Sequence, residues 1–311
     1  MPLFDEKTLR KLDRLALVAA RVRAGQIRGE RRSTKRGTSI EFADYRNYTR
    51  GDDLRRVDWN VYARLERPFI KLLEEEEDLA VHILVDASRS MEWGEGEYNK
   101  FDYALILTAA LGYIALAAGD RLTVTMLRSN FPFPPHPNPL PLGEGRVRGV
   151  RQFGPARGRG HLLPLLTFLD EQAGEGTTDL NAQLRDYALA ARRPGLAFVL
   201  TDLFSPAGYT DGLNALQGRG YEVSMIHLLA PDELEPPLAG DLRLMDVETG
   251  AGQEVTLDGS LRELYKRRVV AWRDEIESHC LKRDVHYVPV VTSTAWERLV
   301  LYHLRRQGLV K

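Results

Sequence analysis

The sequence contains a single cysteine, Cys280, among its 311 residues. One cysteine excludes an intramolecular disulfide and a zinc site built from cysteines, so we expect the protein to work in a reducing compartment. The charge shows no excess of either sign, with 43 Lys and Arg against 44 Asp and Glu. General binders of nucleic acids or of anionic membranes carry a large basic excess. The composition therefore argues against both of these classes.

A secretory signal and a long transmembrane run are lacking as well. Charged residues are scattered through the first 25 positions, which leaves no uninterrupted apolar stretch there. Residues 103–119 are uncharged, but they lie at the lower limit of length for a membrane span and follow a strand pattern. We therefore expect them to form a helix buried in a globular fold, and we predict a soluble, cytoplasmic protein without a membrane span.

Common catalytic motifs are also missing. The sequence has no GxSxG nucleophile elbow, no Walker A loop and no glycine-rich dinucleotide fingerprint after a strand. Asp86 ends a predicted strand, as the aspartyl nucleophile of phosphotransferases does, but Ser88 stands where those enzymes carry a second acid. His82, on a strand pattern, and Cys280, on a helical pattern, are expected to be buried structural residues. We predict that the protein is not an enzyme, with a metal-dependent phosphoester hydrolase as the alternative.

From residue 79 onward, short apolar runs alternate with helical patterns. The predicted strands cover residues 79–86, 121–127, 196–202, 221–229 and 285–291. The predicted helices cover residues 100–119, 161–172, 179–192, 207–218, 260–283 and 295–307. This alternation predicts an α/β fold with a doubly wound, mostly parallel sheet of the Rossmann type and helices on both faces. Residues 241–249 and 253–257 predict an added antiparallel β-hairpin.

The first 78 residues have a different character. Residues 1–24 carry leucines at helical spacing and predict one amphipathic helix. An Arg- and Asp-rich stretch follows, and five acidic residues in a row close it at 74–78. We expect residues 1–78 to form an N-terminal extension packed on a main domain of residues 79–311. Within that domain, residues 131–149 are dense in Pro and Gly and predict an exposed loop, with a proline-rich ligand as the alternative.

Polar side chains follow two of the predicted strands. Asp86, Ser88 and Ser90 come after the first strand, Asp202 after a later one, and two threonines at 177–178 precede a helix. Ligands of parallel α/β sheets bind at the carboxyl ends of the strands. Oxygen donors without His or Cys suit a hard cation, Mg²⁺ or Mn²⁺, rather than zinc. The alternative is that the two serines cap the following helix and that the two aspartates end strands.

This ordered set resembles the metal-ion-dependent adhesion site of von Willebrand factor A domains. In that family the hydroxyls contact the ion, the carboxylates often act through water, and an acidic residue of the partner fills an open position. The resemblance implies Mg²⁺ ligands at Asp86, Ser88, Ser90, Thr178 and Asp202. Thr178 is preferred over Thr177 because the two residues before it then occupy the usual turn positions.

A longer motif narrows the resemblance. It reads Gly37-x3-Glu41-Phe42-x-Asp44-Tyr45-Arg46-x-Tyr48-x2-Gly51-Asp52-Asp53-x-Arg55-x2-Asp58-Trp59, with Ala63-Arg64 after it. This motif is similar to the signature of a bacterial von Willebrand factor A-like family catalogued as domain of unknown function fifty-eight. The likeness covers residues 37–204, weakens toward the C-terminus and departs where Thr49-Arg50 replaces a common proline. No membrane helix precedes the motif, as in the soluble subset of that family.

The resemblance also implies a function and a partner. Members of this family are expected to be Mg²⁺-dependent protein-binding modules that work with MoxR-type AAA+ ATPases in chaperone-like assembly or maturation. The partner would supply an acidic residue to the metal ion. A metal-free scaffold domain is a further alternative.

Two interpretations remain open for the Arg- and Asp-rich motif. Its charged and aromatic side chains would form a buried ion-pair and stacking network that joins the extension to the main domain. Alternatively, exposed Arg and aromatic residues make good contact sites for a protein partner. The residues of such a surface are Arg46, Asp52, Asp53, Arg55, Trp59 and Arg64. The interleaved acids argue against nucleic acid as the partner.

Overall fold

The computed structural model describes residues 6–19, 40–49, 52–53, 57–75, 79–128, 152–190, 193–237, 240–245 and 252–311. The chain divides into two compact units, of which one comprises residues 28–78 and the other residues 1–27 together with 79–311. The predicted boundary after residue 78 coincides with the end of the smaller unit. Residues 1–27, however, group with the main unit and not with the extension. The predicted loop at 131–149 lies outside the described residues.

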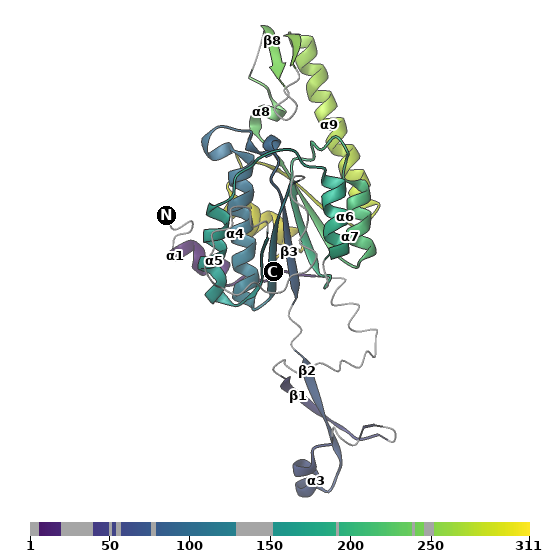
Figure 1. Ribbon diagram of the computed structural model, residues 1–311. Helices are drawn as coiled ribbons and strands as arrows, with labels where there is room; N and C mark the ends of the chain where they lie inside the picture. Colours follow the sequence, from purple (N-terminus) through teal and green to yellow (C-terminus); the bar gives the residue numbers. More distant parts are fainter. Residues whose placement is uncertain are drawn as a thin grey trace. The chain divides into compact units, whose positions relative to one another are not determined.

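A six-stranded sheet forms the centre of the main unit (Figure 1). Its strands are β3 (Ala80–Asp86), β4 (Arg121–Leu127), β5 (Gln152–Arg157), β6 (Leu196–Thr201), β7 (Glu222–Leu229) and β10 (His286–Val291). Their order in the sheet is β10–β7–β6–β3–β4–β5, and all pairs are parallel except β4 with β5. Each of the five predicted strands is therefore confirmed, and the sheet is mostly parallel, as expected.

The edge strand β5 was not among the predicted strands. Its sequence, QFGPAR, contains Gly154 and Pro155, two residue types that are depleted in strands. Proline lacks a backbone donor, so it is tolerated on an edge strand where one side needs no partner. The position of β5 at the end of the strand order explains why this sequence forms a strand at all.

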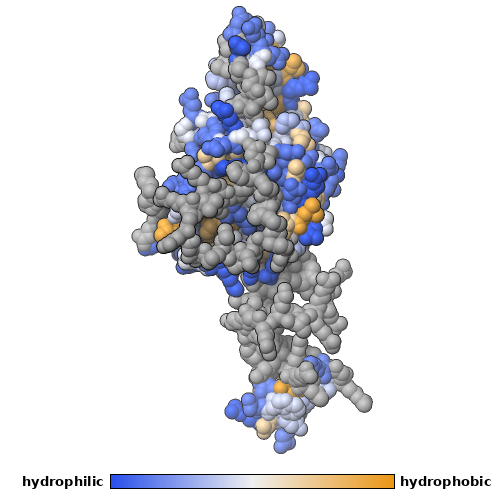
Figure 2. All heavy atoms as spheres, in the orientation of Figure 1, coloured by the Kyte–Doolittle hydropathy of each residue, from blue (hydrophilic) through white to orange (hydrophobic). Residues whose placement is uncertain are grey.

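Helices cover both faces of the sheet (Figure 1). The longer ones are α4 (Lys100–Ala118), α5 (Leu162–Asp170), α6 (Leu180–Ala190), α7 (Thr210–Gly218) and α9 (Gly259–Leu281). Alternate strand residues point to opposite faces, so Ile83 belongs to a core shared with α4 and α5, and Leu84 to a second core shared with α6, α7 and α9. The fold is thus a mixed α/β architecture compatible with a Rossmann-type sheet. Most of the residues drawn in colour on the visible face of this unit are hydrophilic (Figure 2).

Helix α4 is the one helix in the described part of the chain that is long and apolar enough to cross a membrane. In the fold, 72% of the most apolar 18-residue stretch of this helix is buried. Phe101, Leu107 and Leu111 are among its side chains in the first core. This burial is the arrangement expected for the predicted core helix.

The N-terminal segment departs from the predicted helix, whereas the C-terminal segment is helical close to the predicted range. Helix α1 (Glu6–Leu12) ends early, and the backbone around Leu17 forms a bridge with Val310, so one helix over residues 1–24 is wrong. Burial of Leu12, Leu15 and Leu17 in the first core favours this pairing over further helical turns. Near the C-terminus, α10 (Trp296–Arg298) continues as a π-helical segment over Leu299–Leu304.

The predicted hairpin is present as β8 (Gly240–Met245) paired antiparallel with β9 (Gly252–Leu257). It lies between the short helix α8 (Pro231–Leu234) and α9. Asp258 caps α9, because its side chain accepts a hydrogen bond from the backbone N–H of Leu261.

The smaller unit consists of two strands and a helix. Strand β1 (Ile40–Asn47) pairs antiparallel with β2 (Phe69–Glu75), and α3 (Trp59–Leu65) lies between them in the chain. The side chain of Asp58 caps α3 by accepting bonds from the backbone N–H groups of Asn60 and Val61, at 2.9 and 3.2 Å.

Candidate functional site

The candidate site lies where the strand order of the sheet reverses. From β3 the chain continues to β4 on one side, whereas β6, which comes later in the sequence, lies on the other side of β3. Such a switch point is where parallel α/β sheets bind ligands, in the crevice outside the carboxyl ends of the strands. Asp86 is the last residue of β3, and Asp202 directly follows β6. The structure therefore places these two aspartates at the switch point of the sheet.

Asp86 is almost fully buried, and both of its carboxylate oxygens accept hydrogen bonds. The hydroxyl of Thr201 donates to Oδ2 at 2.7 Å, and the backbone N–H of Ser88 donates to Oδ1 at 3.1 Å. Burial and the nearby charge of Asp202 raise the pKa of Asp86 to about 6, although these hydrogen bonds oppose the shift. Two neighbouring buried carboxylates repel each other when both are ionised, so a positive charge nearby stabilises their ionised forms.

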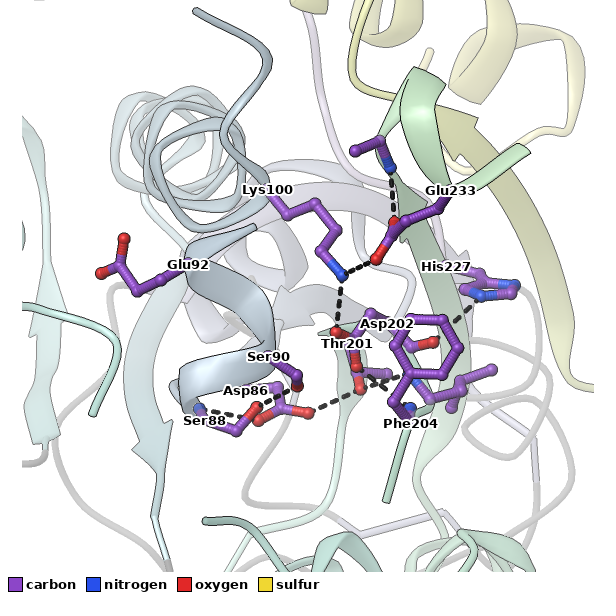
Figure 3. Close-up of polar contacts among 12 residues, drawn as sticks. Asp86, Ser88, Ser90, Glu92, Lys100, Thr201, Asp202, Phe204, His227 and Glu233 are labelled. Carbon is purple, nitrogen blue, oxygen red and sulfur yellow. Dashed lines mark hydrogen bonds and ion pairs between the residues drawn. The ribbon is translucent and has the colours of Figure 1, made fainter. Parts of the chain in front are cut away.

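Ser88 and Ser90 lie in the turn after β3, and their Oγ atoms are 2.9 Å apart (Figure 3). Ser88 precedes a short 3₁₀ helix over Arg89–Glu92, but its side chain makes no capping hydrogen bond there. The following helix α4 is capped by Asn99, whose side chain accepts a bond from the N–H of Asp102. Helix capping therefore does not account for the two serines.

Thr178 comes from a third loop, which is fastened to the turn after β3. The carbonyl oxygen of Leu127 accepts from the Thr178 hydroxyl at 3.2 Å and from the Ala87 N–H at 3.1 Å. The N–H of Glu175 in turn donates to the Ala87 carbonyl at 2.9 Å. Thr178 is buried, whereas Thr177 is exposed, which favours Thr178 as the residue that belongs to the site.

Asp202 is held by groups that the sequence did not single out. Its Oδ1 accepts from the N–H of Phe204 at 3.0 Å, and its Oδ2 accepts from the ammonium of Lys100 at 2.8 Å. Leu203, between Asp202 and Phe204, has φ 61°, a left-handed conformation that is costly for a leucine. The hydroxyl of Thr201 fixes this turn by accepting from the Leu203 N–H at 3.0 Å.

Lys100 is the most unexpected residue of the site. Its side chain is fully buried, and its ammonium group also donates to Oε1 of Glu233 on α8 at 2.5 Å (Figure 3). The second carboxylate oxygen of Glu233 accepts from the N–H of Ala230 at 2.7 Å. A lysine at the start of a mostly apolar helix was the available sequence signal. Its two acidic partners, 102 and 133 residues away, could be identified only from the fold.

The donor set suits a hard divalent cation. Asp86 and Asp202 provide carboxylate oxygens, and the serine and threonine side chains provide hydroxyl oxygens, all at one edge of the sheet. Among the described residues, no group of three or more His, Cys, Asp or Glu side chains is placed to hold a metal ion. Oxygen donors with few charges match the preference of Mg²⁺, which keeps several of its waters.

Two residues that we expected to be structural are buried. The ring nitrogens of His82 lie 2.6 Å from the Tyr187 hydroxyl and 3.0 Å from the Arg193 carbonyl oxygen. Burial lowers the pKa of His82 to about 4. Cys280 is fully buried, and its burial raises the pKa of the thiol to about 11, which disfavours the reactive thiolate.

The predicted partner surface lies in the smaller unit. Trp59 is 60% exposed and makes an edge-to-face contact with Tyr62, with ring centroids 6.0 Å apart. Arg64 and Asp53 are exposed, and Asp52 accepts hydrogen bonds from Thr49. Arg55 and the side chain of Arg46 lie outside the described residues. The role of this surface stays a prediction.

Comparisons with known proteins relate the chain to a family and to several relatives. The model of the family described as "Protein of unknown function DUF58" matches residues 44–138 and 145–275. An uncharacterized protein of Mycobacterium tuberculosis is 27% identical over 272 residues, which cover 88% of this chain and 81% of that protein. A protein of Mycobacterium avium is 35% identical over 85 residues, which cover 27% of this chain and 50% of that protein.

Two solved structures are also similar at low identity. An aerotolerance-related membrane protein from Bacteroides fragilis aligns with a TM-score of 0.40 and 14% identity, over 73% of this chain and 99% of that one. The conserved hypothetical protein BatB from Bacteroides thetaiotaomicron aligns with a TM-score of 0.39 and 13% identity, over 74% of this chain and 98% of that one.

Proposed function

Because the chain belongs to the DUF58 family, whose function is unknown, we propose a function from the site itself: a Mg²⁺-dependent protein-binding module of the von Willebrand factor A type. The observation that supports this most is the pair of buried carboxylates, Asp86 and Asp202, at the switch point of the sheet. The hydroxyl of Thr201 donates to Asp86, and the hydroxyls of Ser88 and Ser90 lie in the turn that follows Asp86.

Each of these residues has a distinct part in the proposed binding. Ser88 and Ser90 would contact the ion through their hydroxyls, and Thr201 holds the Asp86 carboxylate in position for it. Asp202 already accepts from Lys100 and Phe204, so it would act on the ion through water rather than directly. A bound Mg²⁺ would supply positive charge with a free coordination position, which a carboxylate from a partner would occupy.

The nature of the partner follows from this chemistry. A site with two protein carboxylates and an internal ammonium group leaves part of the ion's charge unbalanced, which favours an acidic side chain on the partner. We take a MoxR-type AAA+ ATPase as the candidate partner, in chaperone-like assembly or maturation. The support for this choice is the family resemblance of the sequence.

The test is a binding experiment with the full chain. Titration calorimetry with Mg²⁺ is expected to show binding to the native chain and none to Asp86→Asn. A pull-down from a bacterial lysate is expected to retain a partner in Mg²⁺, and to lose it with a chelator or with Asp86→Asn. The surface variant Asp186→Asn serves as the control, since its side chain lies half-exposed beside Arg185 on α6. Equal Mg²⁺ affinity in all three proteins would contradict the proposal.

One observation favours a second candidate, a metal-free scaffold domain. Lys100 places a permanent positive charge 2.8 Å from Asp202, where it offsets part of the charge that an ion would neutralise. If calorimetry detects no Mg²⁺ binding while the pull-down still retains the partner, the scaffold is the better account.

A further inference from the structure

An apolar pocket lies directly beside the candidate metal site. Its volume is about 210 Å³, and its walls include Phe204, Trp272, Val269 and Leu229. The rings of Phe204 and Trp272 are stacked, with centroids 5.3 Å apart and planes inclined by 6°. An engineered cavity of about 150 Å³ in another protein is large enough to bind benzene. The pocket therefore has room for one large apolar side chain.

The pocket and the candidate metal site share residues. Phe204 lines the pocket, and its backbone N–H donates to Asp202 at 3.0 Å. The ammonium nitrogen of Lys100 lies over the same ring, 5.0 Å from the ring centroid (Figure 3). Glu233 also lines the pocket while it accepts from Lys100. An extended peptide advances about 3.3 Å per residue, so one segment can reach both places within a few residues.

One basic side chain, that of Arg268, lines the pocket, on the helix α9. Residues 262–273 of α9 carry five basic residues and one acidic residue. Of these, Arg268 is exposed and lines the pocket itself. Tyr265 fixes this part of the helix, because its hydroxyl donates to the Glu233 carbonyl at 2.6 Å. Lys266 is already paired with Glu235, so Arg268 is the basic side chain of the pocket that can attract an acidic segment.

From this juxtaposition we propose that the pocket receives a large apolar side chain of the same partner segment whose carboxylate binds the metal ion. The inference rests on the proposed function and specifies its ligand. The recognised segment is acidic, and it carries an aromatic or large aliphatic residue within a few positions of the metal-binding carboxylate. Such an anchor buries apolar area at the centre of the contact, where interface residues contribute most to affinity.

A selection experiment tests this pairing of acidic and apolar residues. A phage-displayed library of short random peptides is selected on the immobilised full chain in Mg²⁺, and in parallel in a chelator. We expect enriched peptides to carry an acidic residue and a large apolar residue at a fixed spacing, in Mg²⁺ alone. Enrichment of acidic residues without an apolar preference, or no enrichment, would overturn the inference.

Two neighbouring valines provide a matched pair of variants. Val269→Glu places a charge in the pocket, whereas Val270→Glu places it at a 55% exposed position that does not line this pocket. An enriched peptide is expected to bind about 10-fold or more weakly to Val269→Glu and almost unchanged to Val270→Glu. Both variants should keep the Mg²⁺ affinity and melting temperature of the native chain. Trp272→Ala removes a wall instead of adding charge, and should also weaken peptide binding if Val269→Glu proves unstable.

The outcomes separate this inference from the proposed function. Equal peptide binding by the two folded valine variants would overturn the pocket as a docking site, whatever the effect of Mg²⁺. Apolar peptides that bind equally in Mg²⁺ and chelator, yet are lost with Val269→Glu, would support the pocket and contradict the metal-dependent function.

Discussion

Lys100→Met is expected to destabilise the protein by about 3–5 kcal/mol when divalent ions are absent, as the loss of one partner of a buried ion pair does. The methionine matches the length of the lysine but brings no charge. It leaves the carboxylates of Asp202, which is 1% exposed, and of Glu233, which is 12% exposed, without their shared cation. Urea unfolding in the presence of a chelator measures the effect directly.

The same substitution at Lys266 provides the control. Lys266 pairs with Glu235 at 3.1 Å, but the two side chains are 35% and 76% exposed. A surface pair of this kind contributes only about 0–1 kcal/mol. If Lys266→Met and Lys100→Met change the free energy of unfolding equally, Lys100 is not the internal counter-ion that the structure indicates.

Lys100→Met should also bind Mg²⁺ more tightly than the native chain. Removal of a positive charge next to Asp202 leaves the site more negative, and each tenfold gain in affinity corresponds to about 1.4 kcal/mol. We expect a gain of about 10-fold, together with a larger rise in melting temperature on adding Mg²⁺. A variant that folds but binds Mg²⁺ more weakly would show that Lys100 supports the metal site rather than competing with the ion.

Asp86→Asn is expected to make the metal-free protein more stable at neutral pH and above. In the folded chain, burial and Asp202 raise the pKa of Asp86 to about 6, from an ordinary value of 3.8. The fold therefore disfavours the charged form by about 3 kcal/mol, since one pKa unit corresponds to about 1.4 kcal/mol. Asparagine carries no charge but loses about 1 kcal/mol of hydrogen bonding, which leaves a net gain of about 1–2 kcal/mol.

The stability difference between Asp86→Asn and the native chain depends on pH. The folded pKa of Asp86 is raised, so the folded state binds the proton more tightly than the unfolded state does. Its contribution to stability is present below the unfolded pKa and is lost as the pH rises through the folded value, between about 4 and 6. The advantage of Asp86→Asn should therefore grow over this interval and level off above it.

Mg²⁺ should reverse the order of the two proteins. Excess Mg²⁺ stabilises the native chain by mass action but gives no such gain to Asp86→Asn, which lacks the ligand. Urea titrations across this pH range, with chelator and with Mg²⁺, measure both effects. A variant that is less stable than the native chain at every pH would indicate that Asp86 serves the fold rather than ligand binding.

The inner strands β3, β6 and β7 were predictable because they are buried on both faces. Residues 80–86 and 196–201 are mostly apolar and are buried at every position, as parallel strands between two helical layers are. Edge strand β5 gave no such signal, because it exposes part of its surface and contains Gly and Pro. The N-terminal segment was predicted as one helix because its leucines suit a helix, and only the C-terminal residues near Val310 show why the helix ends.

The site was predictable only as far as strand ends can be located. Asp86 and Asp202 follow directly from the positions of β3 and β6. The choice between Thr177 and Thr178 depended on which side chain turns inward, and the fold buries Thr178. Lys100 belongs to no recognisable sequence motif, because its two acidic partners, Asp202 and Glu233, are distant in the sequence.

Crystals of the full chain grown with Mn²⁺ would test the central claim most directly, because anomalous scattering locates this ion without reference to the protein atoms. We predict one strong anomalous peak at the carboxyl ends of β3 and β6, in contact with the hydroxyls of Ser88 and Ser90, and its loss in Asp86→Asn. A native crystal in which Lys100 still bonds to Asp202 and no peak lies near these serines would contradict a metal site.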